Sequence, residues 1–331
     1  MLRKRDVAFD PDQIVKAFYR GLLGREAEQK GLASHAGRLR TGYALEALLR
    51  DFTQSDEYKA VLGRSSFPMD GAPPMPVETT CESDERRAIW SHIASVWSEY
   101  GSTEPYWSVV TDDRWRVANM SDERALDEFY DTGGAERERL DAWLSRNAVS
   151  CGSNAVCAEY GCGVGRVTFF LARRFRCVIA LDVSKTHLEA ARRRLRERNI
   201  RNVEYVLVRN RNDLLPLANI DLFYSILTLQ HNPPPIVADI LSCAFKGLNR
   251  GGTAFFQIPT YSKDYSFSVQ RYLRQIARNG AMEMHFLPQR TVLELARTHD
   301  VFPLEIQPDW CIGNPDRWIS STFLMTKRRA G

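Results

Sequence analysis

Three glycines at alternate positions follow a short apolar run in the middle of the chain. The segment reads Glu159-Tyr160-Gly161-Cys162-Gly163-Val164-Gly165. The run over residues 156–160 is typical of a buried strand, and residues 167–174 have the spacing of a helix. A glycine loop between a first strand and a first helix is where an open α/β sheet binds a nucleotide-like ligand. The backbone turns sharply there, and no Cβ blocks the ligand.

Strands and helices alternate through the region that follows. Further strands are predicted at residues 177–182, 203–208, 220–226 and 253–258, with helices at 188–198 and 236–248. This alternation predicts a parallel sheet with helices on both faces. Two more strands, at 303–307 and 319–326, have no helix between them and are expected to pair antiparallel. The sequence thus predicts an α/β fold with seven strands, mostly parallel, and an antiparallel C-terminal strand pair.

The first half of the chain is helical in pattern and divides into three parts. Residues 1–63 carry apolar side chains at helical spacing and are predicted to form a small all-helical domain. Residues 64–81 hold four prolines and a glycine, which is typical of a linker. Residues 82–150 are expected to form helices at 83–100 and 121–130 and, after a break at 131–134, a further helix through residue 143. This part extends the sheet domain of residues 151–331 at its N-terminal side.

The spacing of the glycines bears on which ligand the loop takes. The dinucleotide fingerprint is Gly-x-Gly-x-x-Gly, whereas here the third glycine comes one residue early and Arg166 stands in its place. Glu159 would repel a pyrophosphate, but it can meet the cationic groups of S-adenosylmethionine. The antiparallel strand pair is also unlike a dinucleotide domain. The loop therefore favours S-adenosylmethionine over NAD, and an NAD-dependent oxidoreductase is the alternative.

These residues resemble motif I of the class I S-adenosylmethionine-dependent methyltransferases, and the resemblance covers about residues 155–327. It implies a Rossmann-like methyltransferase sheet, S-adenosylmethionine as cofactor and S-adenosylhomocysteine as product. Asp182 matches the family acid that hydrogen-bonds the ribose hydroxyls, and its alternative role is to cap the next helix. Asn210 or Asp213 would contact the adenine, unless both belong to a solvated turn. The cofactor-binding residues expected from the resemblance are Glu159, Gly161, Cys162, Gly163, Gly165, Asp182, Val183, Asn210, Asp213, Ser225 and Leu227.

A general base is needed if the acceptor is a hydroxyl, because the proton must leave as the new bond forms. His231 is the first candidate, since it follows the fourth strand at the end that should face the acceptor, although histidines there also serve as structural groups. His285 is the second candidate, and Asp112 or Asp113 is the third. The remaining histidines are predicted to lie on helix surfaces: His35, His92, His187 and His299. No cluster of metal ligands is evident in the sequence, so we expect a metal-independent reaction.

Two aromatic segments are predicted to bind the acceptor. One contains Tyr106 and Trp107, ahead of the sheet, and the other contains Tyr261 and Tyr265, after the fifth strand. Aromatic rings stack on the apolar faces of sugar rings, but packing in the core is the alternative. Residues 104–109 resemble a segment of methyltransferases encoded with bacterial polysaccharide genes. This implies an O-methyltransferase for a sugar hydroxyl of a bacterial surface glycan or glycolipid precursor. Another small-molecule or lipid hydroxyl is the alternative acceptor.

The N-terminal helical domain carries a second resemblance. Residues 18–26, 31–32 and 52–58 resemble the DUF4214 family, whose modules accompany bacterial surface-glycan and secretion proteins. The resemblance implies docking to a protein partner and no chemistry. A non-catalytic scaffold with an inert sheet domain is therefore a further alternative, and the acids Glu159 and Asp182 argue against it.

Composition and charge exclude several classes of protein. The net charge of +4 over 331 residues is small, and the arginines between 192 and 198 are expected on a solvated helix face, so no nucleic-acid partner is predicted. Seven cysteines without a Cys-x-x-Cys pair fit a reducing compartment. The charged N-terminus does not read as a signal peptide, and no apolar run approaches the about 20 residues that span a bilayer. We therefore expect a cytoplasmic protein, with peripheral membrane contact still open.

Overall fold

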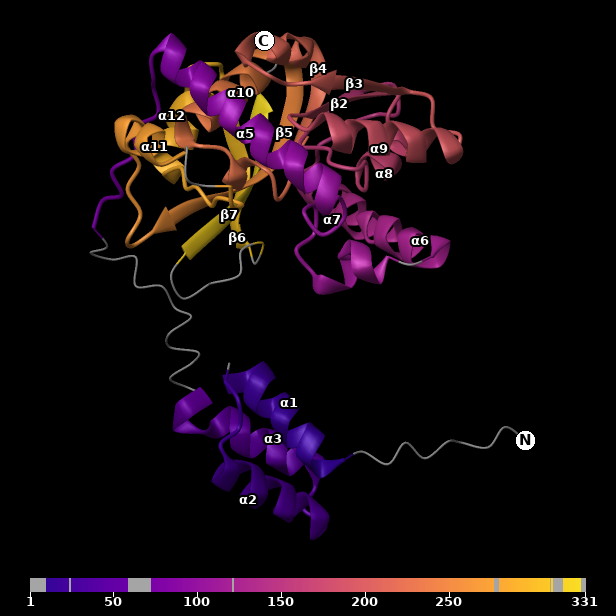
Figure 1. Cartoon of the computed structure of the whole chain (residues 1–331), viewed down its shortest axis with the longest axis vertical. Helices are drawn as coiled ribbons and strands as arrows, with labels where there is room; N and C mark the ends of the chain where they lie inside the picture. Colours follow the sequence, from indigo (N-terminus) through magenta and orange to yellow (C-terminus); the bar gives the residue numbers. More distant parts are fainter. Residues whose placement is uncertain are drawn as a thin grey trace. The chain divides into compact units, whose positions relative to one another are not determined.

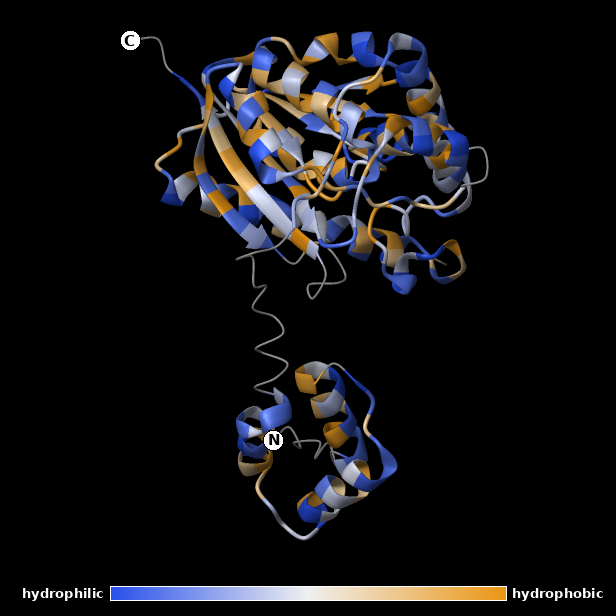
Figure 2. Cartoon of the chain, turned by 90° about the vertical axis from the view of Figure 1, so that its left-hand side faces the viewer, coloured by the Kyte–Doolittle hydropathy of each residue, from blue (hydrophilic) through white to orange (hydrophobic). Residues whose placement is uncertain are grey.

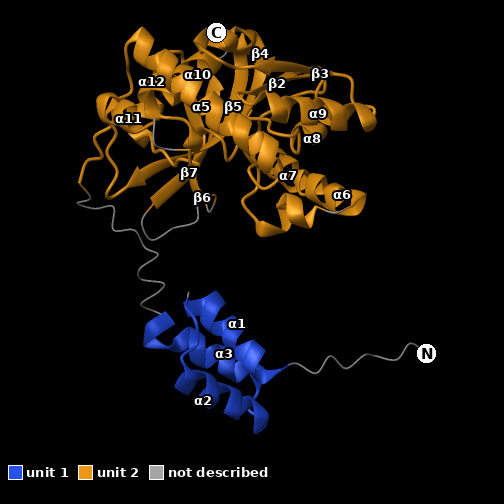
Figure 3. Cartoon of the chain, viewed as in Figure 1, with its two compact units in different colours: residues 1–72 blue, residues 73–331 orange. Residues whose placement is uncertain are grey.

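The computed structural model of the chain divides into two compact units, Met1–Ala72 and Pro73–Gly331 (Figure 3). The structure describes residues 10–23, 25–58, 73–120, 122–276, 280–309, 311 and 318–328. Within these residues, no helix is both long enough and apolar enough to cross a membrane. The first half of the predicted linker, residues 64–72, lies outside the described residues.

The first unit is helical, as the sequence predicts. It contains α1 (Pro11–Leu23), α2 (Gln29–Arg40) and α3 (Leu45–Gln54). Buried residues one helical turn apart form its small core, among them Val15 and Tyr19 on α1 and Leu48 and Phe52 on α3.

The second unit is built on one seven-stranded sheet in the order β3-β2-β1-β4-β5-β7-β6. Its strands are β1 (Val156–Tyr160), β2 (Cys177–Asp182), β3 (Val203–Leu207), β4 (Ile220–Ser225), β5 (Leu248–Ser262), β6 (Val301–Asp309) and β7 (Trp318–Lys327). Strand β7 runs antiparallel to β5 and β6, and the other neighbours are parallel. The predicted fold class is therefore confirmed. The strand order reverses between β1 and β4, which is where open α/β sheets bind their ligands.

Helices cover both faces of this sheet (Figure 1). They are α5 (Ser83–Thr103), α6 (Glu123–Asp131), α7 (Gly133–Arg146), α8 (Thr168–Arg174), α9 (Lys185–Glu197), α10 (Pro234–Gly247), α11 (Val269–Ile276) and α12 (Gln289–Arg297). Short 3-10 turns are η1 (Asp113–Trp115), η2 (Val117–Asn119), η3 (Arg211–Leu217) and η4 (Leu229–His231). Consecutive strand residues point to opposite faces, so Phe255 packs with α7 and α8 while Phe256 packs with α5, α10 and α12. Hydrophobic stretches accordingly run along the strands (Figure 2).

Three features of the second unit differ from what the sequence predicts. Helices α11 and α12 were not predicted, because each is short, although both carry apolar residues at helical spacing. Residues 73–81 were assigned to a linker, but Val77 forms a bridge with Phe267, and the backbone N–H of Glu78 donates to the Phe267 carbonyl at 3.1 Å. Strand β5 extends well beyond the predicted residues 253–258 at both ends.

The arginine run on α9 is only partly solvated. Arg194 is 8% exposed and donates to the carboxylates of Glu123 and Asp127 on α6. Arg198 also pairs with Asp127. The prediction of a solvated face is therefore wrong for Arg194. The acids that pair with it lie on α6, which is far from α9 in the sequence but packs against it in the fold.

Candidate functional site

The glycine loop follows β1 and is tied to β2 by backbone hydrogen bonds. The N–H groups of Gly161 and Cys162 both donate to the Leu181 carbonyl, at 2.7 and 3.1 Å. Gly161 and Gly163 have φ angles of +78° and +53°, which side chains rarely adopt. A Cβ on Gly163 would lie 2.7 Å from Val109 Cγ2. The loop thus needs glycine both for its conformation and for the close approach of another segment.

Asp182 at the end of β2 holds this loop. Its Oδ2 accepts from the Gly163 N–H at 2.8 Å, and its Oδ1 accepts from the Ser184 N–H at 2.8 Å. Ser184 is the N-cap residue of α9, since its hydroxyl accepts from the His187 N–H. Asp182 therefore does not cap the helix directly. Its carboxylate is fixed by two backbone donors and lines a pocket.

The pocket lies at the carboxyl ends of β1, β2 and β4 and holds about 770 Å³ of empty space, counting the part open to solvent. It brings together the following predicted residues: Glu159, Gly161, Cys162, Gly163, Asp182, Val183, Leu227 and His231. It is also lined by residues that were not singled out for it: Trp97, Ser108, Val109, Tyr160, Arg166, Val167, His187, Tyr224, Ile226, Thr228 and Asn232.

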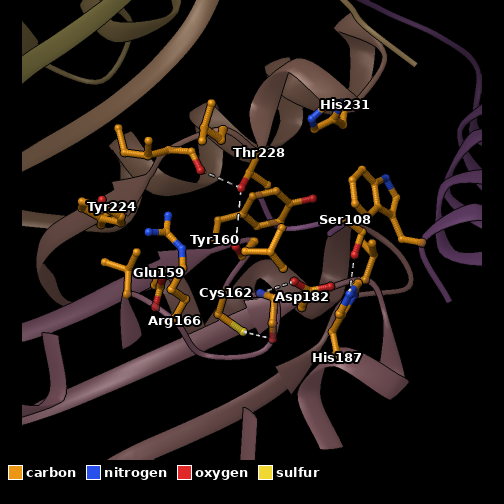
Figure 4. Close-up of a pocket in the computed structure, with 18 of the residues that line it drawn as sticks. Ser108, Glu159, Tyr160, Cys162, Arg166, Asp182, His187, Tyr224, Thr228 and His231 are labelled. Carbon is orange, nitrogen blue, oxygen red and sulfur yellow. Dashed lines mark hydrogen bonds between the residues drawn. The ribbon is translucent and has the colours of Figure 1, made fainter. Parts of the chain in front are cut away.

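Glu159, Arg166 and Tyr224 gather at one end of the pocket (Figure 4). Glu159 is 3% exposed and accepts from the Thr168 hydroxyl at 2.6 Å. Burial raises the pKa of Glu159 to about 8, although that hydrogen bond and nearby Arg166 act in the opposite direction. Arg166 Nε and the Tyr224 hydroxyl are buried and have no hydrogen-bond partner among the described residues. Buried polar atoms need partners, so this end of the pocket is suited to a ligand with an anionic or accepting group.

Ser108 and His187 close the other end of the pocket (Figure 4). The Ser108 hydroxyl lies 3.0 Å from His187 Nε2, and His187 is 1% exposed. The prediction of His187 as a surface residue is therefore wrong. The start of α9 is covered by α5, where a Cβ on Gly101 would lie 2.2 Å from Thr186 Oγ1. Burial lowers the pKa of His187, while the nearby carboxylate of Asp182 acts to raise it.

His231 lines the pocket beside Trp97, with ring centroids 5.1 Å apart. Its Nδ1 lies 2.7 Å from the backbone carbonyl oxygen of Glu283. A carbonyl only accepts, so Nδ1 carries the proton and Nε2 is unprotonated. Burial lowers the pKa of His231 to about 4, and the ring is therefore neutral at physiological pH.

Several predicted cofactor contacts do not line the pocket. Asp213 accepts from the backbone N–H groups of Arg209 and Asn210, and Asn210 caps η3. Asn210 is exposed and Asp213 is half-buried, as expected for the alternative of a solvated turn. The Ser225 hydroxyl donates to the Tyr160 carbonyl at 2.9 Å. A Cβ on Gly165 would lie 2.8 Å from Leu195 Cδ1, so this glycine lets α9 pack closely.

The predicted acceptor residues also lie outside the pocket lining. Tyr106 packs on Phe129 with ring centroids 5.2 Å apart, and Trp107 lies under the Arg116 guanidinium. The hydroxyl of Tyr261 donates to the Pro73 carbonyl, and that of Tyr265 lies 2.9 Å from His285 Nδ1. The two acids proposed as third choice, Asp112 and Asp113, pair with Arg114 and Arg116 respectively. Neither these acids nor His285 is brought to the pocket wall.

Comparison with known proteins bears on the chemistry of this pocket. Residues 158–252 match the family model described as a methyltransferase domain. The chain contains a methyltransferase domain. S-adenosylmethionine is the cofactor of such a domain, as the sequence predicts, and the glycine loop and the unpaired Arg166 and Tyr224 atoms fit a ligand of that kind. Among the described residues, no group of three or more histidine, cysteine or acidic side chains could hold a metal ion.

A curated relative of this methyltransferase domain is the S-adenosyl-L-methionine-dependent Diels-Alderase iccD of Talaromyces variabilis. It is 32% identical over 97 residues, which are 28% of this chain and 32% of that protein. The match thus spans about a third of the relative's length. Two solved structures are similar in fold. One is magnesium protoporphyrin IX methyltransferase (ChlM) from Synechocystis PCC 6803 with bound SAH (13% identity, TM-score 0.48, 70% of this chain and 99% of that chain). The other is the [4+2]-cyclase SpnF (12% identity, TM-score 0.45, 78% of this chain and 100% of that chain).

Replacing Gly163 by alanine should strain the methyltransferase domain. The left-handed conformation costs about 1–2 kcal/mol for a residue with a side chain, and the new Cβ meets Val109 Cγ2. We expect a lower free energy of unfolding in urea, and Val109→Ala should restore only the part due to the contact. Gly152→Ala is the matched control, because nothing lies within 4 Å of its Cβ position. Equal stability of Gly163→Ala and the parent would contradict this reading of the loop.

Proposed function

We propose that this chain is an S-adenosylmethionine-dependent O-methyltransferase whose cofactor lies on the glycine loop and whose acceptor enters beside His231. The observation that carries the proposal is that Asp182, the glycine loop and His231 line one pocket. When bound, S-adenosylmethionine supplies a methyl group already activated by its sulfonium, so the protein mainly contributes alignment and a water-poor cavity. Asp182 would accept from the ribose hydroxyls, and Val183 and Cys162 would lie against the adenine side.

Arg166 and Tyr224 would hold the carboxylate of the cofactor's amino-acid part. Both present a buried polar atom that lacks a partner among the described residues, and a carboxylate can accept from both. Glu159 at the same end would meet the ammonium group. The cofactor residues proposed from the sequence, Asn210 and Asp213, are better explained by their capping bonds.

The acceptor is proposed to be a neutral hydroxyl compound with a flat or apolar face. The charged residues in the pocket lining are Glu159, Arg166 and Asp182, all assigned to the cofactor. The rest of the lining consists of the rings of Trp97 and His187, the Asn232 amide, the hydroxyls of Ser108, Tyr160 and Thr228, and apolar groups. A sugar hydroxyl of a glycan or glycolipid precursor fits this description, and so does another small-molecule or lipid hydroxyl. The glycan proposal is supported by the DUF4214-like residues 18–58 and by residues 104–109, and the N-terminal module would then dock a protein partner.

A second candidate is a cyclase that binds S-adenosylmethionine without transferring its methyl group, because the relative iccD is described as a Diels-Alderase. The two functions differ in their products. Incubating the full chain with methyl-labelled S-adenosylmethionine and panels of sugar, lipid and small-molecule alcohols should yield S-adenosylhomocysteine and a labelled acceptor. Cofactor binding without labelled product from any panel would favour the cyclase or an inert scaffold.

The affinity for S-adenosylhomocysteine should depend on pH through Glu159. In the free protein this carboxyl is neutral below its pKa of about 8, and the ligand's ammonium favours the charged form. Binding should therefore release a proton, and the Kd should fall as pH rises from about 6 to 7.5, by at most about tenfold per unit. The same raised pKa means that the free protein loses stability as pH rises from about 4.5 to 8. Calorimetry of the parent and Glu159→Gln measures both effects. An equal pH dependence of Kd in the two proteins would contradict this role.

A further inference from the structure

A cluster of polar side chains beside the pocket has no part in the proposed reaction. It consists of His92 on α5, Tyr265, Tyr272 on α11, Glu283 and His285, and none of them lines the pocket. His285 and Tyr272 are each 7% exposed, and the side chain of Glu283 is 13% exposed. Burying so many polar groups is costly unless all of them are hydrogen-bonded in a fixed arrangement.

The hydrogen bonds in this cluster are consistent with the following assignment of protons. The Tyr265 hydroxyl lies 2.9 Å from His285 Nδ1, and a phenol next to a ring nitrogen donates to it. His285 Nε2 then carries the proton and donates to Glu283 Oε2 at 2.9 Å. The same oxygen accepts from the Tyr272 hydroxyl at 2.8 Å, and Oε1 faces His92 Nε2 at 3.4 Å. Burial acts to raise the pKa of Glu283, but the bonds from His285 and Tyr272 outweigh it and hold the pKa below its usual value.

The cluster is joined to His231 through the main chain. The Glu283 carbonyl accepts from His231 Nδ1 at 2.7 Å, and the His285 N–H donates to the Gln230 carbonyl at 2.6 Å. Glu283 thus contacts the cluster through its carboxylate and His231 through its main-chain carbonyl oxygen. The bonds to the carboxylate anchor the residue whose main-chain carbonyl accepts from Nδ1 of His231.

A second set of bonds reaches His231 from the sheet. Gln257 on β5 donates to Gln230 Oε1 at 3.0 Å and to the Ser320 hydroxyl at 2.6 Å, while its own oxygen accepts from the Leu227 N–H. With its oxygen occupied, Gln230 turns its amide nitrogen toward His231 Nε2, 3.3 Å away. That group can only donate, so it too is compatible only with an unprotonated Nε2.

We propose that Glu283 is a positioning residue that holds His231 in the tautomer with Nδ1 protonated and Nε2 unprotonated, an inference that rests on the proposed function in assuming that His231 meets the acceptor. The opposite tautomer would present an N–H to the acceptor hydroxyl and could not take its proton. The carboxylate of Glu283, held by Tyr272 and His285, keeps the carbonyl in place. Tyr265 contacts His285 and not Glu283. It determines which nitrogen of His285 carries the proton and donates to the carboxylate.

The test is the tautomer of His231 in the full chain, read from the ¹⁵N shifts of its ring nitrogens in protein saturated with S-adenosylhomocysteine. The parent should show the Nδ1-protonated form. Glu283→Ala keeps the main-chain carbonyl but removes the carboxylate that anchors it, and should lower the ratio of that form to the other by up to about tenfold, the equivalent of the bond from His231 Nδ1 to the carbonyl. Tyr272→Phe removes one donor to the carboxylate, keeps the ring, and should shift the ratio in the same direction by less.

Tyr205→Phe is the matched control, because that tyrosine is on β3, away from the cluster, and its loss of a hydroxyl should leave the ratio unchanged. If Glu283→Ala does not fold, the tautomer ratio of His231 in Tyr272→Phe tests the inference. The parent ratio retained in either folded variant would overturn the inference. Failure of the proposed function is a separate result, since a parent that does not bind S-adenosylhomocysteine still reports its tautomer in the unliganded state.

Discussion

Replacing Asp182 by alanine is expected to raise the Kd for S-adenosylhomocysteine by about 100-fold or more. Two ribose hydroxyls would lose a charged acceptor, each such bond being worth about 1.5–3 kcal/mol. The same change leaves the N–H of Gly163 without its 2.8 Å partner, so the loop itself loses a support. Isothermal titration of the full chain measures the affinity, and thermal unfolding of the same samples measures the cost to the loop.

Asp182→Asn separates these two effects, because its amide oxygen can still accept one backbone N–H while its charge is gone. We expect it to fold better than Asp182→Ala and to bind more weakly than the parent. Asp213→Asn is the matched control, since this acid follows the next strand but lies outside the pocket lining. Its Kd should stay within about twofold of the parent. An unchanged Kd in Asp182→Ala, or a large increase of the Kd in Asp213→Asn, would contradict the assignment of Asp182 as the residue that binds the ribose.

Replacing His231 by glutamine should lower kcat by about 10²- to 10⁴-fold on whichever hydroxyl acceptor the panel identifies. Glutamine fills similar space and can still bond to the Glu283 carbonyl, but it cannot take a proton. The affinity for S-adenosylhomocysteine should change little, because the residues assigned to the cofactor are untouched. Rapid-mixing measurements of methyl transfer at saturating cofactor separate the chemical step from binding.

The pH profile gives a second test of His231. Because burial lowers the pKa of this ring to about 4, the neutral base is present at higher pH, and activity should fall only as pH drops toward about 4. A profile that falls through about 6.5, the value of an ordinary histidine, would point to another group. His299→Gln is the control, since His299 lies beyond α12 and outside the pocket lining. Equal kcat in His231→Gln and the parent would remove His231 from the reaction.

The fold could be predicted from the sequence because its strands and glycine turn leave local signals. The apolar runs at residues 156–160 and 177–182 are followed by Gly161 and Asp182 at the carboxyl edge of the sheet, where parallel topology brings them together. The sequence predicts no helix between residues 303–307 and 319–326, and this indicated the antiparallel pair that β6 and β7 form. In contrast, α11 and α12 are short and were missed.

The site was harder to predict where it depends on contacts between distant segments. His187 has the local pattern of an exposed helical residue, and only the approach of α5 at Gly101 and of Ser108 buries it. Tyr224 sits in an apolar strand and gives no signal that its hydroxyl lacks a partner. Arg166 could be noticed in the sequence, because it stands where a dinucleotide-binding loop has glycine. The sequence did not predict that its side chain lines the pocket.

The most direct measurement of the central claim is calorimetric titration of the full chain with S-adenosylhomocysteine and, separately, with NAD. We expect saturable binding of S-adenosylhomocysteine that Asp182→Ala removes, and no binding of NAD, because Arg166 and the early third glycine leave no cradle for a pyrophosphate. Saturable binding of NAD without binding of S-adenosylhomocysteine would contradict the assignment of this pocket.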